Sequence, residues 1–151
     1  MSALRQRPAI NRDNAFFFDA LKEGRLVAQQ CEKCETFRHP PVPMCPRCHA
    51  LGWKATDIEG TGELISFTVI HHPVVPPFEA GYIVGLVELD HGVRIILNVE
   101  ADEEDVEIGM TLEVRPYPYD DELVLPAAFL PGSESVIVSS TEGKVPHGAN
   151  R

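Results

Sequence analysis

Short segments typical of β-strands, separated by turn residues, dominate the second half of the chain. Residues 63–71 read Glu-Leu-Ile-Ser-Phe-Thr-Val-Ile-His, which is rich in β-branched and aromatic residues and has one clearly apolar face. Four further segments of this type follow, with turn signals at residues 90–92 and at Gly109, and they span residues 82–89, 93–99, 111–116 and 122–130. Because no long helix separates these five strands, we expect a small closed β-barrel, and the five-stranded Greek-key barrel of this size is the OB-fold.

A short helix is predicted before the barrel. It begins near Asn11 and ends at Gly24, with Asp13 or Asn14 as its N-cap. Its apolar stripe consists of Phe16, Phe17, Ala20 and Leu21. This stripe fits either a helix that packs on its own domain or one that docks on a partner, because the segment that follows offers little core. Residues 1–10 resemble a flexible lead-in, and residues 26–30 a strand.

Four cysteines, the only ones in the chain, form two matched Cys-x-x-Cys pairs. Cys31 and Cys34 make the first pair, Cys45 and Cys48 the second, with ten residues between the pairs. Two such knuckles bring four thiolates to one point, as a tetrahedral zinc site requires. With all four positions filled by protein, the metal has no open site for substrate, so we expect it to hold structure. An iron site of rubredoxin type uses the same four sulfurs and stays an alternative.

Other uses of the cysteines fit the sequence less well. Two disulfides would suit a secreted chain, but residues 1–9 carry Arg5, Arg7 and Pro8 and lack the apolar segment of a signal peptide. A thioredoxin-like site needs one Cys-x-x-Cys at a strand-to-helix turn. We therefore expect reduced thiols and a cytoplasmic location. The chain has no run of 18 apolar residues, so the sequence predicts no transmembrane helix.

These patterns divide the chain into four parts. The lead-in and helix take residues 1–25, a rubredoxin-like zinc ribbon residues 26–55, and the barrel residues 56–131, so the expected fold class is mainly β. Residues 132–151 are rich in Ser, Glu and Gly, and we expect them to be largely disordered or to add a strand to a neighbour through residues 136–138.

Charge is distributed unevenly between these parts. Residues 1–54 hold nine Lys or Arg against five Asp or Glu, a net of +4, whereas residues 55–151 hold four against eighteen, a net of −14. The barrel half is therefore a poor match for nucleic-acid phosphates. A nucleic-acid-binding module stays an alternative, because ribbons and OB-folds commonly bind nucleic acid. Six acids in residues 100–107 are typical of a solvated turn.

No catalytic constellation stands out in the sequence. There is no Gly-x-Ser-x-Gly elbow, phosphate-binding glycine loop or His-Glu-x-x-His helix. His71 and His72 end a strand beside the Pro-rich loop of residues 72–81, and they are candidate general bases for a stand-alone acyl-CoA hydrolase, although strand-end histidines are commonly solvated. His39 and His49 lie near the knuckles and are candidate hydrogen-bond donors to sulfur.

Several motifs, taken together, resemble those of a known protein family. They are Cys31-x-x-Cys34, Pro41, Cys45-Pro-Arg-Cys48, Gly60-Thr-Gly-Glu, Ser66-Phe-Thr-Val-Ile-His71, Val87-Glu-Leu-Asp-His-Gly92 and Ile108-Gly109. Over residues 16–130 the chain resembles the zinc-ribbon plus OB-fold family long catalogued as domain of unknown function thirty-five. The resemblance implies a non-catalytic accessory subunit of thiolase-like enzymes, lipid-transfer-protein-type aldolases or hot-dog hydratases. These complexes act on acyl-CoA thioesters, including steroid side-chain intermediates. Among site residues, only the four metal ligands carry over.

The charge pattern suggests how such a subunit meets its ligand. The positive ribbon, with Arg38 and Arg47, would face the phosphates of coenzyme A in a cleft shared with the partner enzyme. Val74, Val75 and Phe78, in the Pro-rich loop, would shield the acyl chain at the barrel mouth.

Overall fold

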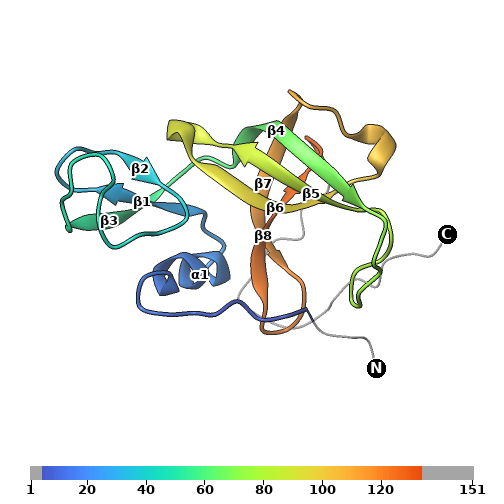
Figure 1. Cartoon of the computed structure of the whole chain (residues 1–151), viewed down its shortest axis with the longest axis horizontal. Helices are drawn as coiled ribbons and strands as arrows, with labels where there is room; N and C mark the ends of the chain where they lie inside the picture. Colours follow the sequence, from blue (N-terminus) through green and yellow to red (C-terminus); the bar gives the residue numbers. More distant parts are fainter. Residues whose placement is uncertain (1–4, 134–151) are drawn as a thin grey trace.

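The computed structural model describes residues 5–133 of the chain, which form a small ribbon, one helix and a closed barrel (Figure 1). The ribbon is a three-stranded antiparallel sheet in the order β2-β1-β3. Its strands are β1 (Val27–Cys31), β2 (Phe37–Arg38) and β3 (Trp53–Asp57). The sequence predicted β1 but not β2 or β3, because a two-residue strand and a largely exposed one carry little apolar pattern.

Helix α1 (Ala15–Lys22) precedes the ribbon. Asn14 is its N-cap residue, but the Asn14 side chain makes no cap bond and instead accepts from the Asn11 N–H at 2.8 Å. The predicted stop at Gly24 is confirmed: Gly24 has a φ of +77° and the Arg25 N–H donates to the Ala20 carbonyl at 2.9 Å. This is the Schellman arrangement, which favours glycine because the left-handed region strains residues with a Cβ.

The barrel confirms the predicted OB-fold topology. Its strands are β4 (Thr61–Ile70), β5 (Tyr82–Glu88), β6 (Arg94–Glu100), β7 (Thr111–Pro118) and β8 (Val124–Phe129). They close in the order β4-β5-β6-β8-β7, with β6 and β8 parallel and the other pairs antiparallel. Short 3-10 turns, η1 (Asp90–Gly92) and η2 (Glu103–Asp105), follow β5 and β6.

A bulge in β4 changes which of its side chains face the core. The register of β4 on β5 shifts between Leu64 and Ser66. An extra residue resets the strand's alternation, so Leu64 is fully buried and Phe67, three positions later, also packs on the core. Gly62 permits close approach, because a Cβ there would lie 2.6 Å from the Glu88 carbonyl oxygen.

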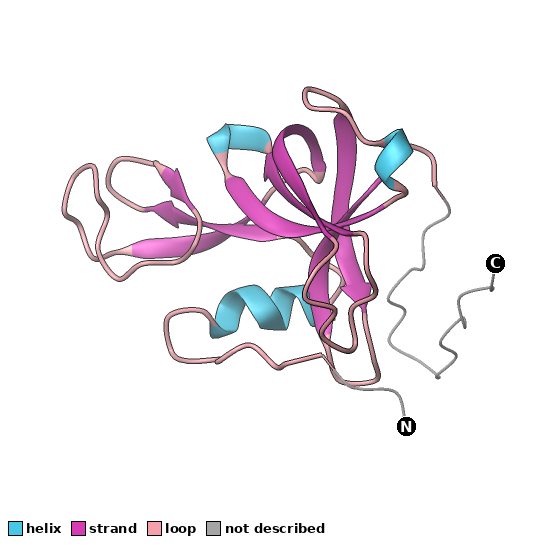
Figure 2. Ribbon diagram, turned by 45° about the vertical axis from the view of Figure 1, so that its right-hand side comes forward, coloured by secondary structure: helices cyan, strands magenta, loops and turns pink. Residues whose placement is uncertain are grey.

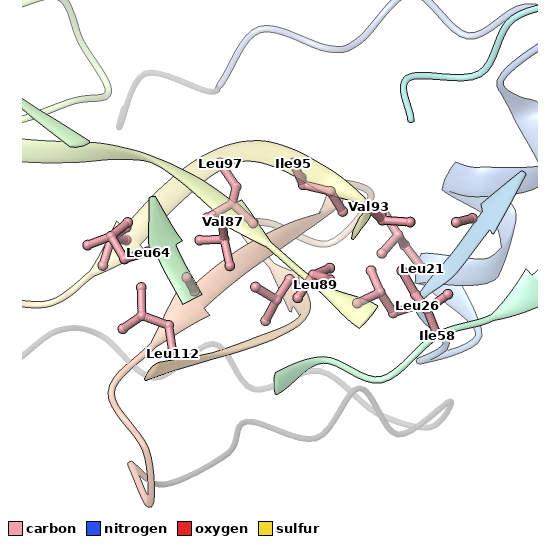
Figure 3. Close-up of a cluster of buried hydrophobic side chains, with 14 of the residues drawn as sticks. Leu21, Leu26, Ile58, Leu64, Val87, Leu89, Val93, Ile95, Leu97 and Leu112 are labelled. Carbon is pink, nitrogen blue, oxygen red and sulfur yellow. The ribbon is translucent and has the colours of Figure 1, made fainter. Parts of the chain in front are cut away.

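One hydrophobic cluster runs through both β units. Leu21 of α1, Leu26 and Ile58 join Val93 and Leu89 of the barrel, as Figure 3 shows. Helix α1 packs on β1, β7 and β8 and lies beside the junction of ribbon and barrel (Figure 2). Of the two interpretations of its apolar stripe, packing within the chain is therefore correct, because the barrel supplies the core that the ribbon lacks.

Residues 5–10 do not form a free lead-in. The Arg5 guanidinium donates to Asn98 Oδ1 at 2.7 Å and stacks over Tyr119, while Arg7 pairs with Asp120 at 2.8 Å. These contacts attach the segment to the barrel. The predictions for residues 134–151, including the added strand at 136–138, lie outside the described residues. Within residues 5–133, no helix is long and apolar enough to cross a membrane.

Candidate metal centre

The two cysteine pairs form knuckles with the same local backbone. In the first, the Glu35 N–H donates to the Cys31 carbonyl at 3.0 Å; in the second, the His49 N–H donates to the Cys45 carbonyl at 2.9 Å. Glu35 and His49 also share a positive φ, of 58° and 61°. Each knuckle thus turns sharply just after its second cysteine, and the turn presents both sulfurs of the pair on one side. Neither position is a glycine, so the sequence alone did not indicate a positive φ there.

The four sulfurs meet at one point between the knuckles. Cys31 Sγ lies 3.6 Å from Cys48 Sγ, and Cys34 Sγ lies 3.6 Å from Cys45 Sγ. All four sulfurs lie within 4.8 Å of one another. Tetrahedral Zn–S bonds of about 2.3 Å place sulfurs about 3.8 Å apart, whereas a disulfide needs about 2.05 Å. The cysteines are free thiols whose geometry fits a four-sulfur metal site.

Electrostatics also favours a cation among these sulfurs. Hydrogen bonding with Thr36, through its Oγ1 at 3.2 Å and its backbone, lowers the pKa of Cys34 to about 6. The Ala50 N–H lowers the pKa of Cys48, but burial and the three neighbouring sulfurs outweigh it and raise that pKa to about 11. Cys34 therefore ionises readily, whereas Cys48 resists ionisation because negative charge accumulates in a small volume. A divalent ion removes that repulsion.

The predicted histidine donors do not reach the sulfurs. His49 serves as the turn residue of the second knuckle, and His39 packs on Phe17 with ring centroids 5.0 Å apart. In the described part of the chain, neither ring hydrogen-bonds a cysteine. His71 and His72, the candidate general bases, are exposed at the start of the loop, and His71 Nε2 lies 3.7 Å from Glu103 Oε2.

Arg38 is not available to a ligand, contrary to the sequence-based expectation. Its side chain is buried, because β2 pairs with β1 and turns it inward. Its Nε–H donates to Gln29 Oε1 at 2.7 Å, and the same oxygen accepts the Val42 N–H at 2.9 Å. Arg38 therefore fixes the Pro-rich crossing between the knuckles instead of meeting solvent.

The other predicted rim residues lie on the surface in two separate places. Arg47 is exposed on the ribbon, with Nη1 3.4 Å from Thr36 Oγ1. Val74 and Val75 are more than half exposed in the loop between β4 and β5. Phe78 is half-buried and stacks on Tyr82, with ring centroids 4.5 Å apart.

One feature escaped sequence reasoning altogether. A groove of about 450 Å³ lies where α1, the crossing at residues 39–41 and strands β5 and β6 meet. It is built from segments far apart in the chain, so no local motif announces it. A signal that could have found it is Ile96, an apolar residue among the polar outward residues of β6.

Taken together, the four-sulfur site and the closed barrel define a zinc-ribbon plus OB-fold protein. Two family models match the chain: the rubredoxin-like zinc ribbon domain of ChsH2 at residues 18–53, and the C-terminal OB-fold domain of ChsH2 at residues 55–115. The solved structure named Ltp2-ChsH2(DUF35) aldolase contains a chain 47% identical to this one. The match covers 82% of this chain and 98% of that chain, with a TM-score of 0.77. The chain belongs to this ChsH2/DUF35 family.

Two curated relatives are hydratase subunits. A probable enoyl-CoA hydratase alpha subunit of Thermomonospora curvata is 50% identical over 125 residues, which is 82% of this chain and 39% of the relative. The 3-oxo-4,17-pregnadiene-20-carboxyl-CoA hydratase alpha subunit of Mycobacterium tuberculosis is 34% identical over 116 residues, which is 76% of this chain and 37% of the relative. The chain thus spans little more than a third of either subunit.

Proposed function

We propose that this chain is a non-catalytic accessory subunit of a lipid-transfer-protein-like aldolase of the thiolase superfamily, or of a related acyl-CoA enzyme. The observation that carries the proposal is the 47% identity to nearly the whole DUF35 chain of the Ltp2-ChsH2(DUF35) aldolase. The name of the M. tuberculosis relative, a steroid-CoA hydratase subunit, supports steroid side-chain degradation as the pathway.

The metal that fits the site best is zinc. Four thiolates at tetrahedral separation suit its preference, and they leave no coordination position for substrate. The ion would then stabilise the ribbon, which has little core of its own, and take no part in the reaction. Metal analysis of protein purified without added metal tests this: we expect one zinc per chain, and one iron per chain would contradict it. Reduced thiols also agree with a cytoplasmic location.

We assign catalysis to the partner because residues 5–133 show no activated nucleophile. His71 and His72 are exposed, and within residues 5–133 no serine or cysteine side chain hydrogen-bonds either ring, as an activated nucleophile would require. The four cysteines belong to the metal site. A stand-alone acyl-CoA hydrolase is therefore the weaker hypothesis.

In the assembled enzyme, this subunit would form part of the wall of the acyl-CoA site. The exposed guanidinium of Arg47 lies on the positive ribbon, where it would attract the phosphates of coenzyme A that the acidic barrel half repels. Val74 and Val75 would exclude water from the acyl chain.

The experiment is reconstitution with Ltp2. The chain and Ltp2 are mixed, separated by size-exclusion chromatography, and assayed for aldol cleavage of a steroid-CoA thioester. We expect a stable complex whose activity exceeds that of Ltp2 alone, and no turnover by the chain alone. Thioester turnover by the isolated chain, or failure to form a complex with Ltp2 and with the thiolase-superfamily subunit of its own host, would overturn the proposal.

A further inference from the structure

The groove between the helix and the barrel occupies the face on which OB-folds bind ligands. Strands β5 and β6 are the second and third of the barrel, and their outer face is the usual OB-fold binding surface. Here Val84 and Ile96 line the groove from these strands, Pro40 and Pro41 line it from the crossing between the knuckles, and Phe18 lines it from α1. Its volume of about 450 Å³ lies within the range of small-molecule sites.

The lining selects for an uncharged, apolar occupant. It contains no Asp, Glu, Lys or Arg, and most of its residues are aliphatic, aromatic or proline. Ile96 is 74% exposed on a strand whose other outward residues are polar, so its side chain is available to a ligand. No Lys or Arg lines the groove to pair with a nucleic-acid phosphate, and burying a phosphate there would be costly.

His39 provides a polar group without a partner inside the groove. The side chains of Asn14, Asn98 and Tyr119 also line it, but they already bond Ala9, Arg5 and Glu100. Among residues 5–133, the His39 ring makes no hydrogen bond. Burial lowers the pKa of His39 to about 4, so the ring is neutral near pH 7 and offers one donor and one acceptor.

Local contacts hold the groove wall at residues 39–41 in place. The Gln29 amide oxygen holds both Arg38 and the Val42 N–H, which fixes the two ends of the crossing at residues 39–41. Prolines at 40 and 41 restrict that wall further. A preformed wall loses little conformational entropy when a ligand enters.

We propose that this groove binds the uncharged, ring-bearing body of the acyl group, with His39 hydrogen-bonded to a keto or hydroxyl oxygen on the rings. This inference rests on the proposed function, which supplies a steroid thioester as the substrate class. Because the groove carries no charge, the nucleotide of coenzyme A lies outside it, toward the ribbon or the partner enzyme.

Titration of the isolated full chain with progesterone, followed by NMR, tests the inference. Progesterone is a neutral ring ketone without coenzyme A. We expect shifts confined to residues 39–41, β5 and β6, and binding at least about tenfold weaker in the I96E variant, which brings a carboxylate into the groove. Ile108→Glu is the matched control: Ile108 is 62% exposed but lies outside the groove, so I108E should bind as the native chain does.

Two comparisons test the chemistry of the lining. The steroid anion cholate should bind more weakly than progesterone, because the lining contains no Lys or Arg to pair with its carboxylate. The H39F variant keeps an aromatic ring against Phe17 but loses the hydrogen bond, so we expect it to bind progesterone about threefold to tenfold more weakly. Equal affinity of H39F and the native chain would overturn the role of His39.

The same variants separate this inference from the proposed function. If progesterone does not bind, or binds I96E as well as the native chain, the inference is overturned, whether or not the native chain forms a complex with Ltp2. If progesterone does not bind and I96E also loses the complex, the groove is instead a docking surface for the partner. If progesterone binds as expected while no complex forms, the proposed function fails but the ligand site stands.

Discussion

The ring of His91 lies flat against the ring of Phe37, with centroids 4.1 Å apart and 3° between the planes. His91 belongs to η1, the turn between β5 and β6, whereas Phe37 belongs to β2 of the ribbon. The turn places His91 in the left-handed region, at a φ of 57°, and so extends its ring toward the ribbon. This contact joins the barrel to the ribbon, beside the hydrophobic cluster that runs through both.

Loss of either ring should weaken that junction. We expect H91A or F37A to lower the free energy of unfolding by about 1 kcal/mol, and a double-mutant cycle to give a coupling energy of about 0.5–1.5 kcal/mol. Chemical denaturation measures both. H72A removes an exposed histidine and should change stability by less than about 0.5 kcal/mol. Strictly additive effects of H91A and F37A would show that the stacking contributes nothing.

Removal of one sulfur should empty the metal site. With four thiolates proposed to share one zinc ion, C45S should lose tightly bound zinc, and the NMR signals of β1, β2 and β3 should lose their dispersion while those of the barrel persist. Metal analysis and two-dimensional NMR are the measurements. H49A, in the same knuckle, should keep one zinc per chain. Full zinc retention by C45S would remove Cys45 from the ligand set.

Charge reversal at the two ribbon arginines should give different results. R38E places a carboxylate in a buried site beside the Gln29 oxygen, so we expect it to destabilise the chain by more than about 3 kcal/mol. R47E changes an exposed side chain and should leave the unfolding free energy within about 0.5 kcal/mol. In the complex with Ltp2, R47E should raise KM for the acyl-CoA several-fold. An unchanged KM would place coenzyme A away from Arg47.

Stability should fall on mild acidification because of His39. Burial holds its folded-state pKa at about 4, below the ordinary 6.5, so the unfolded state binds the extra proton first. The contribution is present above about pH 6.5, falls as the pH decreases, and is gone near pH 4. Its size is on the order of 3 kcal/mol. Urea unfolding with saturating zinc should show a pH slope in this window that H39F lacks. A His39 ring that titrates near 6.5 by NMR would contradict this.

Local patterns in the sequence were sufficient for much of the fold. The cysteine spacing indicated the four-sulfur cluster, because two short knuckles constrain their own sulfurs. Short runs of β-branched and apolar residues between turn signals at 82–89 and 93–99 predicted β5 and β6, whose burial then alternates because only one face of each strand meets the core. Gly24 and Gly92 marked the end of the helix and a hairpin turn, where positive φ favours glycine.

Tertiary structure alone decided what those elements do together. From the sequence, Arg38 was expected on the surface, but it is buried because β2 pairs with β1. The apolar stripe of α1 packs against the barrel. The groove likewise is lined by residues from separate segments, between Pro8 and Pro126, that only folding brings together. The sequence by itself determined features whose energy comes from neighbours along the chain, whereas burial, exposure and shape depend on contacts between distant segments.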